Sequence, residues 1–166
     1  MRTGAPDTGI PLLQDSLKAL SASRYGLVTT MLKCELAGGL ARRGNIAQAL
    51  EMIDERIQSL DESGEFYYMP DLLRTKGEIQ ALAGAELQAE AERTLLQSLD
   101  WSRRQDALSF ELEAQISLAR FRARAGNVLG TNQDLAETFA RFTEGFGTPD
   151  LLAAASLLRD FDGTSI

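Results

Sequence analysis

LARRGN at residues 40–45 is the stretch that decides the fold, because weaker copies of it follow as ALAGA at 81–85 and ARAGN at 123–127. Each copy contains a glycine, with an alanine three residues before it and a very small residue seven residues before it. These positions are Gly44, Ala41 and Ala37; Gly84, Ala81 and Gly77; and Gly126, Ala123 and Ala119. Glycine ends helices by adopting a left-handed conformation, and residues four apart share one helix face. Each copy therefore predicts the end of a helix with a strip of small residues, where a neighbouring helix can approach closely.

The segment after each glycine repeats as well, with two extra residues needed after Gly84. The matching apolar positions are Ala49, Ile53 and Ile57; Ala91, Leu95 and Leu99; and Thr131, Leu135 and Phe139, where a threonine replaces the alanine. The three glycines lie 40 and 42 residues apart, so each unit has the length of one helical hairpin. A single hairpin cannot bury its apolar face, whereas stacked hairpins can. The pattern therefore predicts a stack of helical hairpins.

Apolar residues recur at helical spacing along almost the whole chain, and no stretch alternates as a strand does. The pattern predicts helices at 11–22, with Pro11 in the first turn, and at 25–43, 46–62, 66–83, 87–104, 107–125, 129–144 and 149–160. We therefore expect an all-α fold, a right-handed α-solenoid of about three and a half helical hairpins plus a C-terminal capping helix. We expect a disordered N-terminus at 1–9 and one repeat domain at 10–166, with repeats at about 25–64, 65–105 and 106–146 and the capping helix at 149–160.

The stretch FTEGFGTPDL at 142–151 has two possible interpretations, a phosphate-binding loop or the junction of two helices. A phosphate loop needs a preceding strand and a Lys-Ser or Lys-Thr pair, and the sequence has neither here. Thr148 is a good helix cap, and Pro149 suits the first position of a helix. The stretch therefore predicts the start of the capping helix.

The composition excludes several classes of function. The 166-residue chain has a net charge of −7 and no histidine, which argues against direct nucleic-acid contact, catalytic triads and histidine-bearing zinc sites. Its one cysteine, Cys34, cannot form an internal disulfide, and this fits the reducing cytoplasm. No apolar run approaches the roughly 18 residues of a membrane span. We expect a non-enzymatic cytoplasmic protein without a cofactor, a metal site or a membrane segment.

The repeat resembles the tetratricopeptide repeat, with a longer period, over residues 25 to about 140. Two stretches, RRQDALSFELEAQISLARF at 103–121 and FTEGFGTPDL at 142–151, resemble the C-terminal tetratricopeptide-like region of large bacterial signalling proteins. In that family a class III nucleotide cyclase or a winged-helix DNA-binding domain precedes an ATPase module and the helical array. The family usually has aspartate at the position of Gly147. The resemblance implies a regulatory or scaffold module whose partner is either a separate protein or peptide or the upstream domains of its own parent chain.

In tetratricopeptide arrays the first helix of each hairpin lines a concave binding surface, so the resemblance implies a set of groove residues. These are Arg42, Asp71, Arg74, Glu78, Glu113, Arg120 and Arg124. Because Arg120 and Arg124 are one helical turn apart, they share a face, and arginines gathered in a groove can bind a carboxylate or an acidic segment. The alternative interpretation is a solvated face of mixed charge, in which Glu78 and Glu113 pair with the arginines.

Two further segments have open interpretations. The helix at 11–22 carries Leu13, Leu17 and Leu20 on one face and has no earlier partner in the sequence. It is either the second half of a hairpin that belongs to a longer protein, or a self-association surface that makes a homodimer. The stretch GEFYYMPD at 64–71 forms either an aromatic binding lip or a hydrophobic staple to the previous hairpin.

Overall fold

The computed structural model describes residues 6–20, 26–64, 66–127 and 131–163, and these residues are helical with no strand among them. The helices are α1 (Pro6–Leu20), α2 (Gly26–Arg42), α3 (Ile46–Ser63), α4 (Met69–Leu82), α5 (Gln88–Arg104), α6 (Leu108–Arg124), α7 (Thr131–Ala140) and α8 (Pro149–Gly163). The short 3-10 helices η1 (Phe66–Tyr68) and η2 (Ala85–Leu87) lead into α4 and α5. The all-α prediction is confirmed for the described residues.

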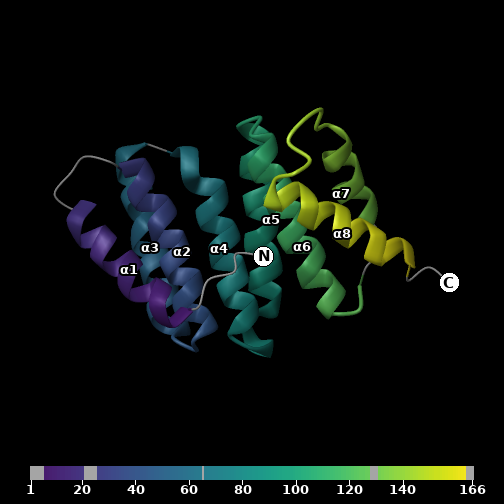
Figure 1. The fold of residues 1–166 in the computed structure, drawn as a ribbon. Helices are drawn as coiled ribbons and strands as arrows, with labels where there is room; N and C mark the ends of the chain where they lie inside the picture. Colours follow the sequence, from purple (N-terminus) through teal and green to yellow (C-terminus); the bar gives the residue numbers. More distant parts are fainter. Residues whose placement is uncertain (1–5, 21–25, 65, 128–130, 164–166) are drawn as a thin grey trace.

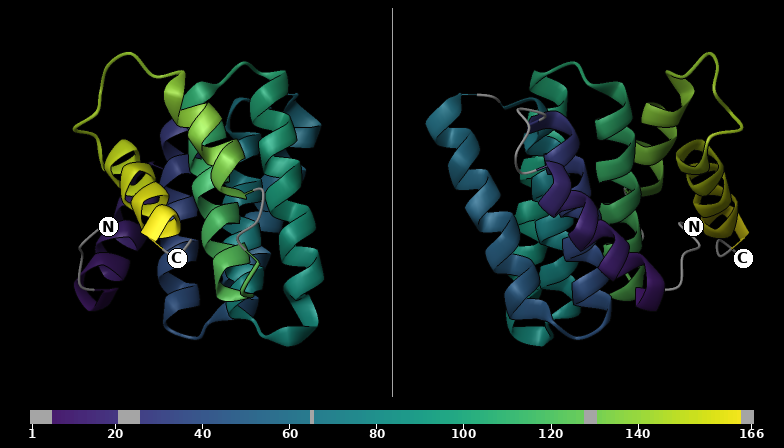
Figure 2. Two further views of the ribbon diagram at one scale, coloured as in Figure 1. Left: turned by 90° about the vertical axis from the view of Figure 1, so that its right-hand side faces the viewer. Right: turned by 60° about the vertical axis from the view of Figure 1, so that its left-hand side comes forward.

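Each helix packs against the next one along the chain, so that α2 to α6 stand side by side (Figure 1). In addition, α4 packs directly on both α2 and α6, and α6 packs on α8. Figure 2 shows α1 and α8 on one side of the molecule and α5 on the opposite side. The helices α2, α4 and α6 therefore form a continuous layer, and α1 and α8 flank one face of it.

The repeated glycines end α2 and α6 with the same backbone geometry. Gly44 and Gly126 have φ angles of 87° and 75°, in the left-handed region that favours glycine. The N–H groups of Gly44 and Gly126 donate to the carbonyls of Ala41 and Ala123, at 2.9 and 3.0 Å. The following asparagine N–H reaches the carbonyl four residues before each glycine in both cases. These bonds satisfy carbonyls that the end of a helix leaves without partners.

The strip of small residues allows close helix packing. Ala37 and Ala119 are fully buried. A Cβ atom added to Gly77 would lie 2.8 Å from Cγ of Leu95 and 3.1 Å from the carbonyl oxygen of Ala91, both in α5. The strip of small residues is predicted to let a neighbouring helix approach closely, and this prediction is confirmed for α4 and α5.

The buried apolar side chains form two clusters. The first cluster joins α1 to α4 and includes Ile10, Leu40, Ile53 and Leu72, and the second joins α6 to α8. The second cluster contains Leu112, Leu135, Leu151 and Ala154. The position-matched Leu95 of α5 is also buried, with 1% of its surface exposed. The apolar pattern of the second helices thus identifies true core positions. Among the described helices, none combines the length and the apolar character needed to cross a membrane.

Three predicted boundaries are wrong, and one of them is the end of α8, which lies at Gly163 instead of 160. The first helix begins at Pro6, so residues 6–9 are helical instead of disordered, and Pro11 lies inside the helix; residues 1–5 are outside the described part. Proline is well tolerated at the first position of a helix, and packing of Ile10 on the first cluster outweighs the backbone bond that Pro11 cannot make. The helix α7 ends at Ala140 instead of 144, because the next two N–H groups bond to carbonyls only three residues back.

The first helix has a partner that follows it in the sequence. The helix α1 packs on α2, and Leu13 and Leu17 contact the first cluster and are half-buried. Leu20 is half-buried as well. The chain itself therefore covers part of the apolar face for which a homodimer contact is predicted. Gly39 contributes to the packing of α1 on α2, because a Cβ atom there would lie 3.3 Å from Cγ1 of Ile10.

The close α4–α5 contact gives a stability prediction. We expect Gly77→Ala to lower the free energy of unfolding by about 1–2 kcal/mol, because overpacking costs more than the gain in helix propensity. Gly9→Ala is the matched control, since no atom lies within 4 Å of its added Cβ. That substitution should raise stability by about 0.5–1 kcal/mol. Urea unfolding followed by circular dichroism measures both values, and an equal gain for the two variants would contradict the close contact.

Candidate functional site

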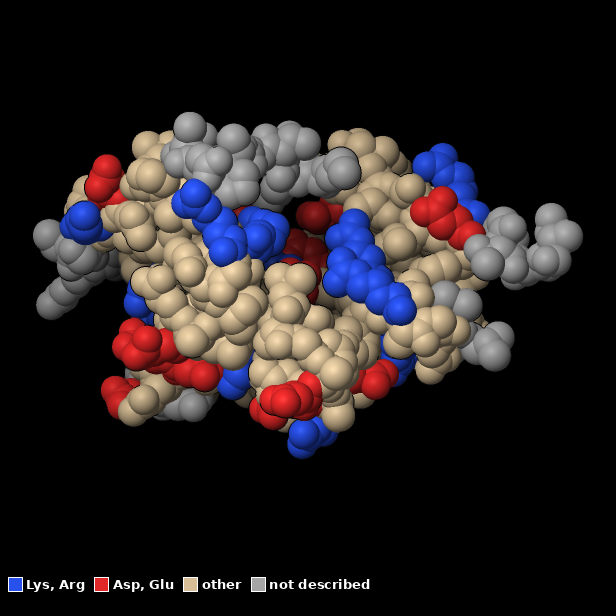
Figure 3. Space-filling model, turned by 90° about the horizontal axis from the view of Figure 1, so that it is seen from below, with Lys and Arg blue, Asp and Glu red and all other residues tan. Residues whose placement is uncertain are grey.

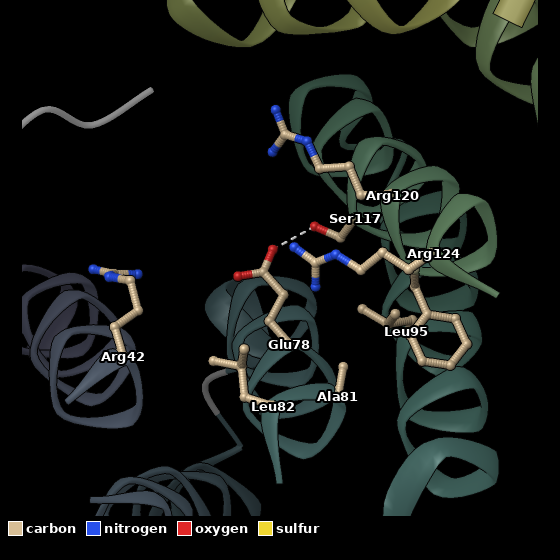
Figure 4. A pocket seen from close by; sticks show the side chains of 9 residues that line it. Arg42, Glu78, Ala81, Leu82, Leu95, Ser117, Arg120 and Arg124 are labelled. Carbon is tan, nitrogen blue, oxygen red and sulfur yellow. Dashed lines mark hydrogen bonds between the residues drawn. The ribbon is translucent and has the colours of Figure 1, made fainter. Parts of the chain in front are cut away.

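Two adjoining hollows of about 200 and 230 Å³ open on the layer formed by α2, α4 and α6. Arg42 and Glu78 line both of them. Arg120 and Arg124 line the first hollow together with Ser117, and Arg74 lines the second together with Cys34 and Thr75. Five of the seven predicted groove residues, Arg42, Arg74, Glu78, Arg120 and Arg124, thus line these two hollows, and Asp71 and Glu113 form ion pairs with Arg74. Figure 4 shows the side chains around the first hollow.

The helical period explains this convergence. In α4, Asp71, Arg74 and Glu78 follow one another at spacings of three and four residues, so they lie on one face. In α6, Glu113 and Ser117 are four residues apart and also share one face. Each contacts the α4 residue that lies 39 positions earlier: Ser117 contacts Glu78, and Glu113 contacts Arg74. The contacting residues of the two helices therefore share one offset, which is three residues shorter than the distance in sequence between Gly84 and Gly126.

Arg74 is the centre of an ionic cluster, which we define as Arg74, Asp71, Glu78 and Glu113. Its guanidinium donates to the carboxylates of Asp71 and Glu78, at 2.9 Å in the second case, and its Nε lies 3.3 Å from Oε2 of Glu113. The side chain of Arg74 is 17% exposed and that of Asp71 10%. Burial acts to lower the pKa of Arg74, but the carboxylates of Glu78, Asp71 and Glu113 together outweigh it and raise this pKa above its usual value. The arginine therefore stays charged.

The ionic cluster leaves the remaining groove arginines without partners. Ser117 donates its hydroxyl to Glu78 at 2.5 Å, and the other bond of this carboxylate comes from Arg74. Glu78 and Glu113 do pair with an arginine, as the mixed-charge interpretation expects. That arginine is Arg74, however, and neither carboxylate forms an ion pair with Arg120 or Arg124 among the described residues.

We define the arginine rim as Arg42, Arg120 and Arg124. All three are exposed and point toward the first hollow from α2 and α6 (Figure 4). None forms an ion pair or a hydrogen bond with a described residue, whereas five arginines elsewhere in the described chain do form ion pairs. These are Arg74, Arg103, Arg104, Arg122 and Arg141. Figure 3 looks toward the groove, with basic side chains on two sides of a hollow and acidic side chains deeper inside it.

No protein-family model, curated protein or solved structure that was compared with the chain matches it. A role for the groove must therefore be argued from its own chemistry. Within the described residues, no group of three or more acidic, cysteine or histidine side chains is arranged to hold a metal ion.

Cys34 lies in the second hollow but is not arranged as a nucleophile. Its side chain is 4% exposed. Burial, followed by the nearby charge of Asp71, raises the pKa of the thiol well above its ordinary value. Because the thiolate is the reactive form, this thiol is inert at neutral pH.

An aromatic cluster lies at the N-terminal ends of α4 and α6, and only its two tyrosines were singled out from the sequence. We define it as Tyr67, Tyr68 and Phe110, whose ring centroids lie 5.0–5.9 Å apart. The two interpretations of GEFYYMPD each describe half of the segment. Phe66 is a staple, with its ring 5.4 Å from that of Trp101 in the core, whereas Tyr67 is 61% exposed. Phe110 lies three residues before Glu113 on the groove face of α6, and this spacing is the signal in the sequence.

The ionic cluster gives a second stability prediction. We expect Arg74→Met to lower the free energy of unfolding by about 3–5 kcal/mol, because Asp71 and its neighbours then lose their buried counter-charge. Lys76→Met is the matched control on the same helix. Lys76 makes one pair, 2.7 Å from an Asp54 that is 52% exposed, so its loss should cost less than about 1 kcal/mol. Chemical denaturation measures the free energy of unfolding of both variants. Equal losses would show that the ionic cluster stabilises the fold no more than the Lys76–Asp54 ion pair does.

The buried thiol predicts a dependence of stability on pH. Because the folded pKa of Cys34 exceeds the ordinary value of 9.0, the unfolded chain loses this proton first as the pH rises. The stabilising contribution is therefore complete below that value and is lost progressively above it. We expect the difference in unfolding free energy between wild type and Cys34→Ala to shrink by about 1 kcal/mol from about pH 8 to about pH 10. A difference that stays constant over this interval would contradict the buried, protonated thiol.

Proposed function

We propose that the chain is a non-catalytic interaction module whose groove docks an acidic segment of a protein or peptide. The observation that carries this proposal is the arginine rim, in which three exposed cations from two helices surround one hollow and form no ion pair with the described part of the chain. Guanidinium groups bind carboxylates through paired, charge-assisted hydrogen bonds. An acidic ligand would supply the partners that the rim arginines do not find among the described residues.

We further propose that the helices form a tetratricopeptide-like right-handed α-solenoid with α8 as its capping helix. Three contacts support the stacking of successive hairpins in one register, because each joins residues 39 positions apart, which is close to the 40 and 42 residues between the repeated glycines. They are Gln105 with the Phe66 carbonyl, Glu113 with Arg74, and Ser117 with Glu78. The direct packing of α4 on α2 and of α6 on α4 is the packing expected between the first helices of successive hairpins.

The charge of the whole chain bears on how such a ligand would be recognised. The net charge is −7, so an acidic ligand gains little from long-range attraction and must be held by the local rim. Interactions of exposed charges also weaken with salt, because the screening length is about 8 Å at physiological ionic strength. Affinity for an acidic peptide should therefore fall as salt is added.

The proposed biological setting follows from the resemblance of the stretches at 103–121 and 142–151 to the C-terminal arrays of large bacterial signalling proteins. In this setting the module works in the cytoplasm as a sensor or docking domain, and its ligand is either a separate protein or an upstream domain of the same chain. A ligand that binds one curvature of the array better than another would shift the attached output domain. This mechanism needs no cofactor, metal, membrane or nucleic acid.

The test is a selection from a phage-displayed library of random peptides, followed by affinity measurements on synthetic copies of the selected peptides. We expect the wild-type chain to select peptides rich in aspartate and glutamate. Their affinity should fall by roughly tenfold or more for the double variant Arg120→Glu with Arg124→Glu, because charge-assisted bonds are lost and repulsion is added.

The matched control is the double variant Lys18→Glu with Arg93→Glu, which makes the same change in net charge at exposed positions on α1 and α5. Circular dichroism should show equal helicity for all three proteins. Equal affinity for wild type and the Arg120/Arg124 variant, or selected peptides without acidic residues, would refute the proposed function.

A further inference from the structure

We propose that the groove reads a second chemical feature, so that its ligand is an extended peptide segment with an aromatic residue about four to six residues from its acidic residues. In this arrangement the acidic residues bind the arginine rim and the aromatic side chain packs on the aromatic cluster. The inference rests on the proposed function and specifies the ligand of the same groove.

The two binding features lie on the same faces of the same helices. In α6, the residues Phe110, Glu113, Ser117, Arg120 and Arg124 follow one another at spacings of three, four, three and four. This spacing keeps the side chains on one helix face, and Glu113 and Ser117 of that face contact α4 residues at the groove. The aromatic cluster is therefore at the N-terminal end of the groove, and the arginine rim is at the C-terminal end.

The aromatic cluster also lies near residues that line the second hollow. The 3-10 helix η1, which carries Tyr67 and Tyr68, packs against both α2 and α4. The pKa of Tyr68 is raised by burial and then by the charges of Tyr67, Asp71 and Cys34. Since Cys34 lines the second hollow, the tyrosine hydroxyl lies near the groove wall, and the cluster continues the groove surface.

The exposure of the cluster makes it available to a ligand. Tyr67 is 61% exposed, and Tyr68 and Phe110 are only half-buried. Their rings meet edge to face, which leaves ring surface open to a further aromatic partner. Phe66 next to them is packed on Trp101 instead, so the open ring surface belongs to the three residues of the aromatic cluster.

The distance between the two ends of the groove fixes the spacing in the ligand. From Phe110 to Arg120 and Arg124 there are 10 and 14 residues of helix, or about 15 and 21 Å at ~1.5 Å per residue. An extended chain advances about 3.3 Å per residue, so about four to six residues of peptide cover this distance. A small anion at the rim would leave the aromatic end empty.

The middle of the groove explains why the proposed ligand is extended and contacts mainly the two ends of the groove. The ionic cluster fills this part, where Asp71, Glu78 and Glu113 each form an ion pair with Arg74. A ligand backbone can cross over these paired charges but gains little from them. Recognition is therefore concentrated where the chain leaves its side chains unpaired or exposed, at the arginine rim and the aromatic cluster.

The experiment uses four synthetic peptides of one length in a Gly/Ser background, each carrying a fluorescent label. The full peptide has one tryptophan and a Glu-Glu pair about five residues apart, and the others have Trp→Ser, Glu→Gln, or a spacing of about one residue. We expect the full peptide to bind the wild type about three- to tenfold more tightly than the Trp→Ser and short-spacing peptides, the gain expected for one aromatic contact.

This gain should disappear in Tyr67→Ser with Phe110→Ser, while the affinity of the Trp→Ser peptide stays unchanged. Tyr67→Ser alone, at a side chain that is mostly exposed, should remove part of the gain even if the double variant unfolds. No gain on the wild type, or a gain that survives both variants, would overturn this inference and leave the acidic site standing. If the Glu→Gln peptide binds as tightly as the full peptide, or if no peptide binds, the proposed function fails together with it.

Discussion

Three carboxylates from two neighbouring helices share the guanidinium of Arg74, and the arrangement of the groove follows from this cluster. Asp71 and Glu78 approach Arg74 from α4, and Glu113 approaches it from α6. The cluster contains one positive and three negative charges, so it can form only where a nearly buried arginine has several partners. It fixes the register of α4 against α6 at 39 residues and thereby sets which side chains face one another along the whole groove.

The same cluster separates two kinds of arginine. Arg74 forms ion pairs with the acidic side chains of the inner groove, and among the described residues these side chains form none with Arg120 or Arg124. All of these groups lie on helix faces at helical spacing. Along the helix axis the groove therefore has an aromatic end, a middle of paired charges and a cationic end. An acidic protein can in this way present a local cationic surface, although its net charge is −7.

Much of this arrangement could be predicted from the sequence, because the repeat carries it. The glycines at 44, 84 and 126 placed the helix ends to within a few residues, and the resemblance to tetratricopeptide arrays implied residues of which five line the two hollows. The course of α1 could not be predicted, because it lies outside the repeat and its start depends on the packing of Ile10 against α2. The open face of Phe110 was also missed, since an aromatic residue near a helix start usually packs inside a hairpin junction.

The pairing of the arginines could be predicted in part from each helix alone. Arg74 has one acidic residue three positions before it and another four positions after it, whereas Arg120 has no acidic residue at these spacings. The pairing between helices could not be predicted, because contacting residues of α4 and α6 lie 39 positions apart, whereas the glycines that end these helices lie 42 positions apart. At 39 positions Arg74 corresponds to Glu113 and Arg120 to Ala81, but at 42 positions Arg120 would correspond to the carboxylate of Glu78. The packing of α4 on α6, which the repeat length alone does not give, therefore decides which arginine meets a carboxylate of the neighbouring helix.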